Sequence, residues 1–403
     1  MQEKETTFIS GGSTPQSVSI KPRFNNVDIL RGIIMVLMAL DHTRDFFTNV
    51  RFDPLDLDQT NVALFFTRWI THFCAPVFVF LAGTGACLSL NRGKSKPDLR
   101  KFLITRGIWL IILELTLVRF GWFFNFDYSL IIVQVIWAIG WSMIFLSFIC
   151  GFSLKTISIT GILIIVSHNL LDGINPEQFG SLSWFWKILH VQAPIELGDG
   201  NVFFVIYPLI PWIGVMAAGY GFGGLFKLEE KKRNKIFIRL GLSLTAAYVI
   251  LRLINVYGDP NHWNYQKNFV LTFLDFLDTT KYPPSLLYLL MTLGPAIASL
   301  PFLSKTGRTM RNFFVIFGRV PMFYYLIHVP LIHLLALLTA IAIGLNSSFL
   351  TGNLFFDLWP GNWGYNLSTV YLIWIAVVIS LYPICRWYSQ IKKKKKSKWL
   401  GYL

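Results

Sequence analysis

Long apolar runs separated by short polar segments make up most of the chain. A bilayer core about 30 Å thick takes about 20 helical residues to cross, since each residue adds about 1.5 Å. Runs of roughly this length have the approximate limits 28–48, 64–90, 107–124, 129–150, 156–171, 202–226, 236–254, 283–303, 320–344 and 367–387. The pattern predicts an all-α, polytopic integral membrane protein with about ten transmembrane helices.

Polar segments flank this apolar region. Residues 1–26 lack the basic, apolar and small-residue order of a cleaved signal sequence, so we expect a disordered cytoplasmic arm. Residues 27–388 then form one transmembrane domain, and residues 389–403 form a basic cytoplasmic tail that contains Lys392–Lys396. We expect this tail to be a solvated anchor at an anionic leaflet.

Composition agrees with a bilayer as the solvent. Of 403 residues, 54% are hydrophobic and 14% are charged, and the mean hydropathy is +0.53. The net charge of +15 does not indicate a nucleic-acid partner, because Lys and Arg lie between the apolar runs rather than on a soluble basic face. The four cysteines lie inside apolar runs without a CxxC spacing, so we expect neither a disulfide framework nor a metal site.

Basic residues are unevenly shared between the connections. Cytoplasmic loops of membrane proteins retain Lys and Arg. If the N-terminal arm lies inside, the inner connections hold most of the basic residues, whereas the outer loops hold only Arg51, Lys187, Lys267 and Lys281. The sequence therefore predicts that both termini are cytoplasmic and that the protein lies in the cytoplasmic (inner) membrane.

The first run carries ionisable residues where they are costly. An ionisable side chain inside a membrane span is unfavourable unless it is paired or hydrated. At about 100° per residue, Asp28, Arg31, His42 and Asp45 fall within one arc of about 100°. His42 lies about 21 Å along the helix from Asp28, since 14 residues separate them. One polar face therefore crosses the bilayer and faces the protein interior.

Two interpretations of this face remain. Asp28 with Arg31, and His42 with Asp45, are spaced three apart, so they can be purely structural pairs. Two acids and an imidazole are nevertheless more polarity than packing needs, and a histidine oriented by a carboxylate is a general-base arrangement. We therefore take His42, oriented by Asp45 or Asp41, as the candidate catalytic base.

Two further runs carry polar residues on one face. Arg68 and His72 lie one turn apart in the second run, before a kink expected at Pro76. His72 is either a second active-site residue or a structural histidine bonded to a carbonyl. In the ninth region, Arg319 lies at the cytoplasmic boundary, where it either snorkels or binds phosphate. His328 either lines the same cavity or bonds to Tyr324.

Taken together, these residues resemble a known family. The segments are 28–32 (DILRG), 40–47 (LDHTRDFF), 73–83 (FCAPVFVFLAG), 282–285 (YPPS) and 317–328 (FGRVPMFYYLIH). The set is similar to bacterial relatives of heparan-alpha-glucosaminide N-acetyltransferase, among the transmembrane acyltransferases, over most of residues 24–387. The resemblance implies an acetyl-CoA-dependent membrane acyltransferase that moves an acetyl group from the cytoplasm to an extracytoplasmic amino sugar or other glycan. In the animal enzymes an asparagine and a histidine serve the site, and His42 stands in the place of that asparagine.

Acyl transfer from a thioester needs a base, a donor for the oxyanion and a cationic grip on the CoA phosphates. We assign His42, Asp45, Asp41 and His72 to catalysis. Acceptor binding is assigned to Arg68, Arg44, His328 and Tyr324, and CoA binding to Arg31, Asp28, Arg319, Arg308 and Arg311. The expected partners are membrane lipids and a sugar or glycan acceptor, with a homodimer allowed and nucleic acid not expected.

Two other function classes use the same features. In a transporter or lipid-linked-sugar flippase, the buried Asp and His residues bind substrate or relay protons. In a membrane scaffold they are structural only. Specific binding of acetyl-CoA separates the acyltransferase from the transporter, and a scaffold is identified if Asp28, His42 and Asp45 tolerate alanine without loss of a cellular phenotype.

Overall fold

A computed structural model of the chain describes residues 24–353 and 359–394. In chain order the elements are α1 (Asn25–Phe47), α2 (Val62–Thr71), α3 (Cys74–Asn91), α4 (Lys96–Leu113), η1 (Glu114–Val118), α5 (Arg119–Phe123), β1 (Leu130–Val133), α6 (Val135–Ile149), α7 (Leu154–Ser167), η2 (His168–Leu171), η3 (Pro176–Leu182), α8 (Ser183–Leu189), β2 (Ala193–Gly198), β3 (Asn201–Val205), α9 (Leu209–Gly223), η4 (Gly224–Lys227), α10 (Glu230–Ile254), α11 (Phe269–Leu277), α12 (Leu286–Leu303), α13 (Arg308–Arg319), α14 (Pro321–Ala342), α15 (Ser348–Thr351) and α16 (Leu367–Lys394).

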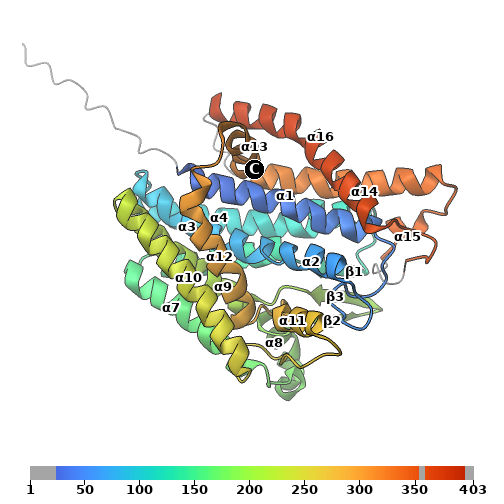
Figure 1. Cartoon of the computed structure of the whole chain (residues 1–403), viewed down its shortest axis with the longest axis horizontal. Coiled ribbons are helices and arrows are strands. Elements are labelled where there is room, and N and C mark those ends of the chain that lie inside the picture. Colours follow the sequence, from blue (N-terminus) through green and yellow to red (C-terminus); the bar gives the residue numbers. More distant parts are fainter. Residues whose placement is uncertain (1–23, 354–358, 395–403) are drawn as a thin grey trace, which may run out of the picture.

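The long helices form one bundle in which α1 is central (Figure 1). Helix α1 packs against α2, α3, α12, α13, α14 and α16, while α3 and α7 both pack against α9 and α10 packs against α12. Its central place explains why α1 is buried along most of its length despite its charged residues. The polar face predicted for this helix therefore does lie inside the protein.

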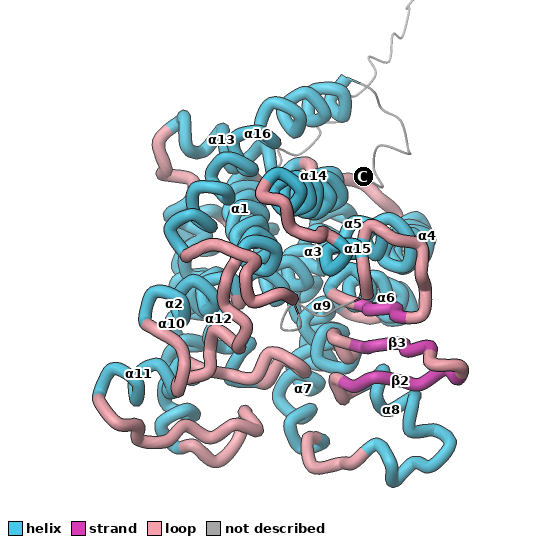
Figure 2. Tube along the Cα trace, turned by 90° about the vertical axis from the view of Figure 1, so that its right-hand side faces the viewer, coloured by secondary structure: helices cyan, strands magenta, loops and turns pink. Residues whose placement is uncertain are grey.

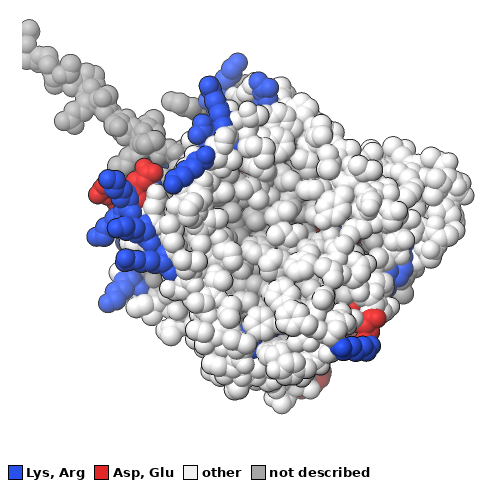
Figure 3. Space-filling model, viewed as in Figure 1, with Lys and Arg blue, Asp and Glu red and all other residues white. Residues whose placement is uncertain are grey.

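Seven helices in the described part of the chain are long and apolar enough to cross a membrane. They are Val62–Asn91, Leu154–Leu171, Leu209–Lys227, Glu230–Ile254, Leu286–Leu303, Pro321–Ala342 and Leu367–Lys394. On the face shown in Figure 3, Lys and Arg gather mainly at the end of the molecule where α1 begins, next to a broad uncharged surface. The mostly helical, polytopic membrane architecture predicted from the sequence is confirmed.

The all-α prediction is wrong in one region, because the described residues include a three-stranded sheet of order β1-β3-β2. Figure 2 shows the strands side by side beside α6 and α8. Strands β1 and β3 pair in parallel, and β2 and β3 pair antiparallel. The apolar runs 129–150 and 202–226 each begin with one of these strands. Their first residues are rich in Ile, Val and Phe, which suit a strand as well as a helix, and hydropathy does not separate the two.

Several predicted boundaries also move. Helix α1 begins at Asn25, inside the predicted arm, and α16 continues to Lys394, inside the predicted tail. The rest of the arm (1–23) and of the tail (395–403) lies outside the described residues. The segment between the eighth and ninth apolar runs contains the helix α13, although no apolar run predicts a helix there. Helix α13 is amphipathic and only 12 residues long, so a search for long apolar runs does not find it.

The expected kink near Pro76 appears as a break between α2 and α3. Proline has no N–H to donate to the carbonyl four residues earlier, which here is His72. The Tyr288 hydroxyl of α12 instead donates to the His72 carbonyl oxygen at 2.7 Å. The break is thus stabilised by a hydrogen bond from a neighbouring helix.

Glycines let α1 and α13 cross in close contact. A Cβ atom added at Gly32 would overlap the backbone carbonyl of Phe314, and one added at Gly318 would overlap that of Asp28. The Arg31 guanidinium donates to the Gly318 carbonyl oxygen at 3.1 Å across the same crossing. This close approach brings Arg31 and Arg319 to one place at the end of the bundle.

We expect Gly318→Ala to lower the melting temperature of the purified protein. Forcing an added methyl group into a close-packed contact typically costs about 1–3 kcal/mol. Gly307→Ala is the matched control, because a Cβ at Gly307, just before α13, meets nothing within 4 Å. Equal melting temperatures for the two variants would contradict the close crossing.

Candidate functional site

A cavity of about 360 Å³ lies at the end of α1 away from its N-terminus. It is lined by Asp41, His42, Arg44, Asp45, Arg68, Trp122, Phe123, Ile132, Gln134, Gln192, Phe204, Ile206, Tyr207, Lys281, Tyr282, Phe349, Leu350, Gly352 and Trp359. We call it the outer pocket. Its walls come from α1, α2, α5, the small sheet and the segments before α12 and around α15, so distant parts of the sequence meet here.

Ion pairs fix the acidic residues of the outer pocket. The Arg68 guanidinium donates to both Asp41 carboxylate oxygens, at 2.9 and 3.0 Å, and Arg44 lies 3.0 Å from the same carboxylate. Arg44 also donates to Asp45. The acids are thus neutralised by arginines, and neither makes a described hydrogen bond to His42. The expectation that Asp41 or Asp45 orients His42 through a hydrogen bond is not met among the described contacts.

A second histidine takes that orienting place. Nδ1 of His42 lies 2.8 Å from Nε2 of His328 on α14. Nδ1 of His328 lies 3.0 Å from the Tyr324 carbonyl oxygen and 2.8 Å from that of Tyr325. Carbonyl oxygens only accept, so Nδ1 of His328 carries a proton and, in the neutral ring, its Nε2 accepts. Nδ1 of His42 must then donate to it, which leaves the lone pair of His42 on Nε2.

This chain of hydrogen bonds gives the neutral His42 ring a defined tautomer, with the lone pair on Nε2. His42 is partly exposed and lines the outer pocket, whereas His328 is fully buried. The ring of Trp122 packs edge-on against His42, with centroids 4.9 Å apart. Of the two alternatives considered for His328 from the sequence, the bond to Tyr324 is met, whereas His328 lines neither cavity and contacts the outer pocket only through His42.

His72 and Tyr324 do not line the outer pocket. The His72 ring is buried and packs against Tyr288, with centroids 5.4 Å apart, and its nitrogens have no hydrogen-bond partner among the described residues. Tyr324 stacks on His328 at 5.0 Å between centroids. Neither residue faces the cavity: Tyr324 contacts the histidine pair through His328, and His72 packs against α12.

A second cavity, of about 390 Å³, opens at the other end of α1. We call it the inner pocket. Its basic lining residues are Arg31, Arg92, Lys94, Arg106, Arg319 and Lys392. Deeper in, it is lined by apolar side chains that include Met35, Met38, Ile136 and Met322, and by Tyr325. The inner pocket therefore combines a cluster of basic side chains with an apolar lining. This combination suits a ligand with phosphates at one end and an extended, weakly polar arm.

Of the five residues assigned to CoA binding, the structure brings three together at the inner pocket and leaves two outside it. Arg31 and Arg319 line the inner pocket, and Asp28 lies 3.4 Å from Arg31 and 3.8 Å from Arg319, so it holds these two cations together. Arg308 and Arg311 belong to α13 but do not line this cavity.

Sequence reasoning missed several lining residues. Arg92, Lys94 and Arg106 come from the connection between the second and third apolar runs, whose basic residues were interpreted only as a topology signal. Lys281 and Tyr282 precede α12 and reach the outer pocket. Burial raises the pKa of the Tyr282 phenol, but the positive charges of Lys281 and Arg68, together with hydrogen bonds to Lys281 and Tyr207, outweigh burial, so that pKa lies below its usual value. Lys281 therefore contributes positive potential to the outer pocket.

The two cavities follow one another along α1. Met38 lines the inner pocket and His42, one turn later, lines the outer pocket. The Tyr325 ring of the inner pocket lies 6.3 Å from the His42 ring, centroid to centroid. Helix α1 thus contributes Arg31 to a basic cavity near its start and the His42 imidazole to a second cavity near its end. The distance along the helix axis from Arg31 to His42 is about 16 Å (11 residues at about 1.5 Å each).

The chain matches a model of one known protein family. The model of the family described as heparan-alpha-glucosaminide N-acetyltransferase, catalytic, matches residues 23–252. Among curated proteins, none matches the chain significantly. The matched segment is more than half of the chain and runs from α1 into α10, so it contains His42, Asp41 and Arg68. The chain therefore belongs to the heparan-alpha-glucosaminide N-acetyltransferase family of membrane proteins.

Proposed function

We propose that this protein transfers an acetyl group from cytoplasmic acetyl-CoA to an amino sugar or other glycan on the opposite face of the membrane. The observation that carries the proposal is that one face of α1 places Arg31 in the basic inner pocket and His42 in the outer pocket. Membership in the acetyltransferase family supports acetyl-CoA as the donor.

In this proposal the CoA phosphates bind Arg31, Arg319 and the other cations of the inner pocket. The pantetheine arm then follows the apolar shaft past Met38 and brings the thioester to His42. His42 Nε2 takes a proton from the acceptor amine or hydroxyl as that group attacks the thioester carbonyl. The C–S bond breaks, and the CoA sulfur leaves with a proton returned by His42. Lys281 supplies positive charge for the oxyanion formed during attack.

The topology that we propose has ten membrane-crossing segments and both termini in the cytoplasm. It adds α1, the α4–α5 segment and α6 to the seven apolar spans. Helix α1 carries several charged side chains, which lower its mean hydropathy, and α6 is shorter than a full span. A search by length and hydropathy therefore selects neither helix. The gathering of Lys and Arg where α1 begins supports this orientation in a cytoplasmic membrane (Figure 3).

Sided proteoliposomes test the proposal. Labelled acetyl-CoA is supplied on the side where α1 begins, and glucosamine is supplied only on the other. We expect labelled N-acetylglucosamine to appear on the glucosamine side, and only with acetyl-CoA on the side of the basic end. Absence of acetyl-CoA binding by the purified protein, or product formation independent of sidedness, would overturn the proposal.

Arg319→Ala should raise the KM for acetyl-CoA about tenfold while leaving kcat nearly unchanged. Loss of one charge-assisted contact to phosphate costs about 1.4 kcal/mol or more, and that cost falls on binding rather than on the distant chemical step. Steady-state kinetics with varied acetyl-CoA measure the change. Arg308→Ala is the matched control on the same helix, because Arg308 is exposed and lies outside the inner pocket. An equal effect of both substitutions would contradict the assignment of the phosphate site.

A further inference from the structure

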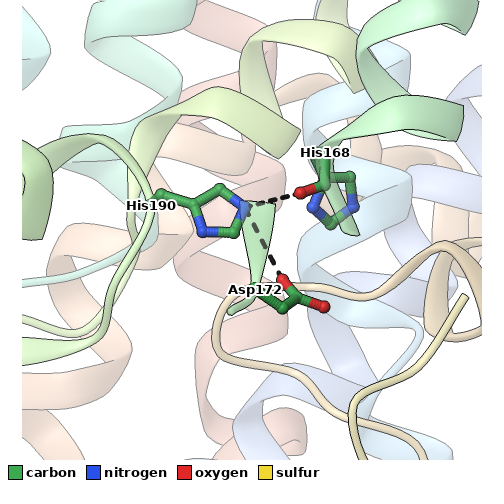
Figure 4. Close-up of side chains that lie close together, drawn as sticks. All are labelled: His168, Asp172 and His190. Atoms are coloured by element: carbon green, nitrogen blue, oxygen red, sulfur yellow. Dashed lines mark hydrogen bonds and ion pairs between the residues drawn. The ribbon is translucent and has the colours of Figure 1, made fainter. Parts of the chain in front are cut away.

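Three side chains outside both pockets meet at the outer end of α7. His168 begins η2, Asp172 follows η2, and His190 follows α8. One ring nitrogen from each histidine and one Asp172 oxygen all lie within 4.8 Å of one another. Figure 4 shows His190 and Asp172 directed toward a common point beside the His168 ring. Because Asp172 and His190 are 18 positions apart, a search of the sequence for short metal-binding motifs does not find the cluster.

The polar contacts within the cluster are incomplete. Nε2 of His190 lies 3.0 Å from the His168 carbonyl oxygen and 3.7 Å from an Asp172 oxygen. His168 is 1% exposed, and neither of its ring nitrogens has a hydrogen-bond partner among the described residues. A buried imidazole without a partner is unfavourable, so this side chain requires an explanation.

Neighbouring contacts hold the other members of the cluster in place. The Asn169 amide donates to the second Asp172 oxygen at 2.7 Å, and its own carbonyl oxygen accepts from the Leu286 backbone N–H. The Trp186 ring stacks on His190, with centroids 5.4 Å apart. Ligands that are oriented by second hydrogen bonds and by packing are typical of metal sites.

We propose that His168, Asp172 and His190 bind a divalent transition-metal ion, with zinc as the best fit. Two imidazole nitrogens and one carboxylate oxygen are a donor set that zinc accepts, and water completes a tetrahedral site. Zinc holds such donors at about 2.0–2.2 Å, which places them about 3.3 Å from one another. The present spacing therefore has to contract, and His190 exchanges its contact with the His168 carbonyl oxygen for the metal. This proposal differs from the expectation of no metal site in the sequence analysis, because that expectation considered only the spacing of the cysteines.

The position of the site suggests what the metal does. It joins the outer end of α7 to the segment before β2, and Gln192, two residues after His190, lines the outer pocket. Strand β2 pairs with β3, whose Phe204 also lines that pocket. A bound ion thus anchors the wall of the outer pocket, a structural role that is separate from the proposed transfer chemistry.

Metal binding is measured on the purified full chain without acetyl-CoA. The protein is stripped with a chelator, incubated with Zn²⁺ alone, passed through a desalting column and analysed for bound metal, and its melting temperature is recorded with and without Zn²⁺. We expect about one equivalent of zinc and a higher melting temperature. In His168→Ala and His190→Ala the bound zinc should fall to background, and in Asp172→Asn the zinc affinity should fall at least tenfold.

His262→Ala is the matched control, because His262 is an exposed histidine in another outer connection, and it should retain the full equivalent. If a histidine variant does not fold, Asp172→Asn and the zinc-dependent melting temperature of the unchanged protein decide. Wild-type protein that binds no more zinc than His190→Ala, or equal loss in His262→Ala, would overturn the site. Neither result bears on acetyl transfer, so this inference fails or stands apart from the proposed function.

Discussion

Replacing His42 with alanine should lower kcat for acetyl transfer by about 100-fold to 10,000-fold, the range that a positioned general base contributes. The lone pair that we assign to His42 Nε2 is the only base that the proposed mechanism uses in the outer pocket. The nearby carboxylates of Asp41 and Asp45 are held by Arg68 and Arg44, so they are poor substitutes. Because His42 lies far from the cations of the inner pocket, acetyl-CoA binding should remain within a few-fold of wild type.

The assay for this variant compares initial rates of labelled acetyl transfer with equilibrium binding of acetyl-CoA to the same preparation. His262→Ala, an exposed histidine away from both pockets, should retain wild-type kcat. A His42→Ala enzyme with kcat within tenfold of wild type would remove His42 from the catalytic role. Loss of acetyl-CoA binding together with activity would instead indicate that the substitution damages the fold.

Hydropathy located most of the fold because bilayer thickness sets a minimum helix length that apolar runs must meet. It did not locate the strands, since residues such as Ile131, Ile132 and Phe203 satisfy the apolar criterion in either structure. Nor did it locate α13, whose amphipathic pattern is short. Sheet formation depends on pairing between segments about 70 residues apart, namely β1 and β3, and single-run periodicity carries no information on such pairing.

The candidate site divides in a similar way. Helical periodicity placed Asp28, Arg31 and His42 on one buried face, because the angles within a single helix follow from the sequence alone. The sequence pattern predicted Asp45 or Asp41 as the partner of His42. In the structure these acids form ion pairs with Arg44 and Arg68, and His42 forms its hydrogen bond with His328. The residues of that histidine pair are 286 positions apart, so the pairing follows only from the packing of α1 against α14.

The site also extends beyond the segment that defines the family. The family match ends at residue 252, yet Lys281 lines the outer pocket and Arg319 lines the inner pocket. His328, which contacts His42, lies further along still. Segments after the matched region therefore complete both cavities.

His328 provides the second large effect, as a positioning residue that acts through His42. His328→Leu removes the acceptor for the His42 Nδ1 proton at similar volume, so His42 loses its fixed tautomer and ring orientation. We expect kcat to fall about 100-fold, toward the effect of losing the base itself, with the KM for acetyl-CoA unchanged.

The conservative variant separates positioning from packing. In His328→Gln, the side-chain carbonyl oxygen can accept from His42 Nδ1 while the amide nitrogen donates to the Tyr324 or Tyr325 carbonyl oxygen, so kcat should recover to within about tenfold of wild type. His333→Leu is the matched control, since His333 is a buried histidine on the same helix whose Nδ1 lies 3.0 Å from the Gly121 carbonyl oxygen, and it should lower the melting temperature without a comparable loss of kcat in the folded protein. If Gln and Leu at position 328 reduce kcat equally, the hydrogen bond to His42 does not orient the base, and the contact between α1 and α14 acts through packing alone.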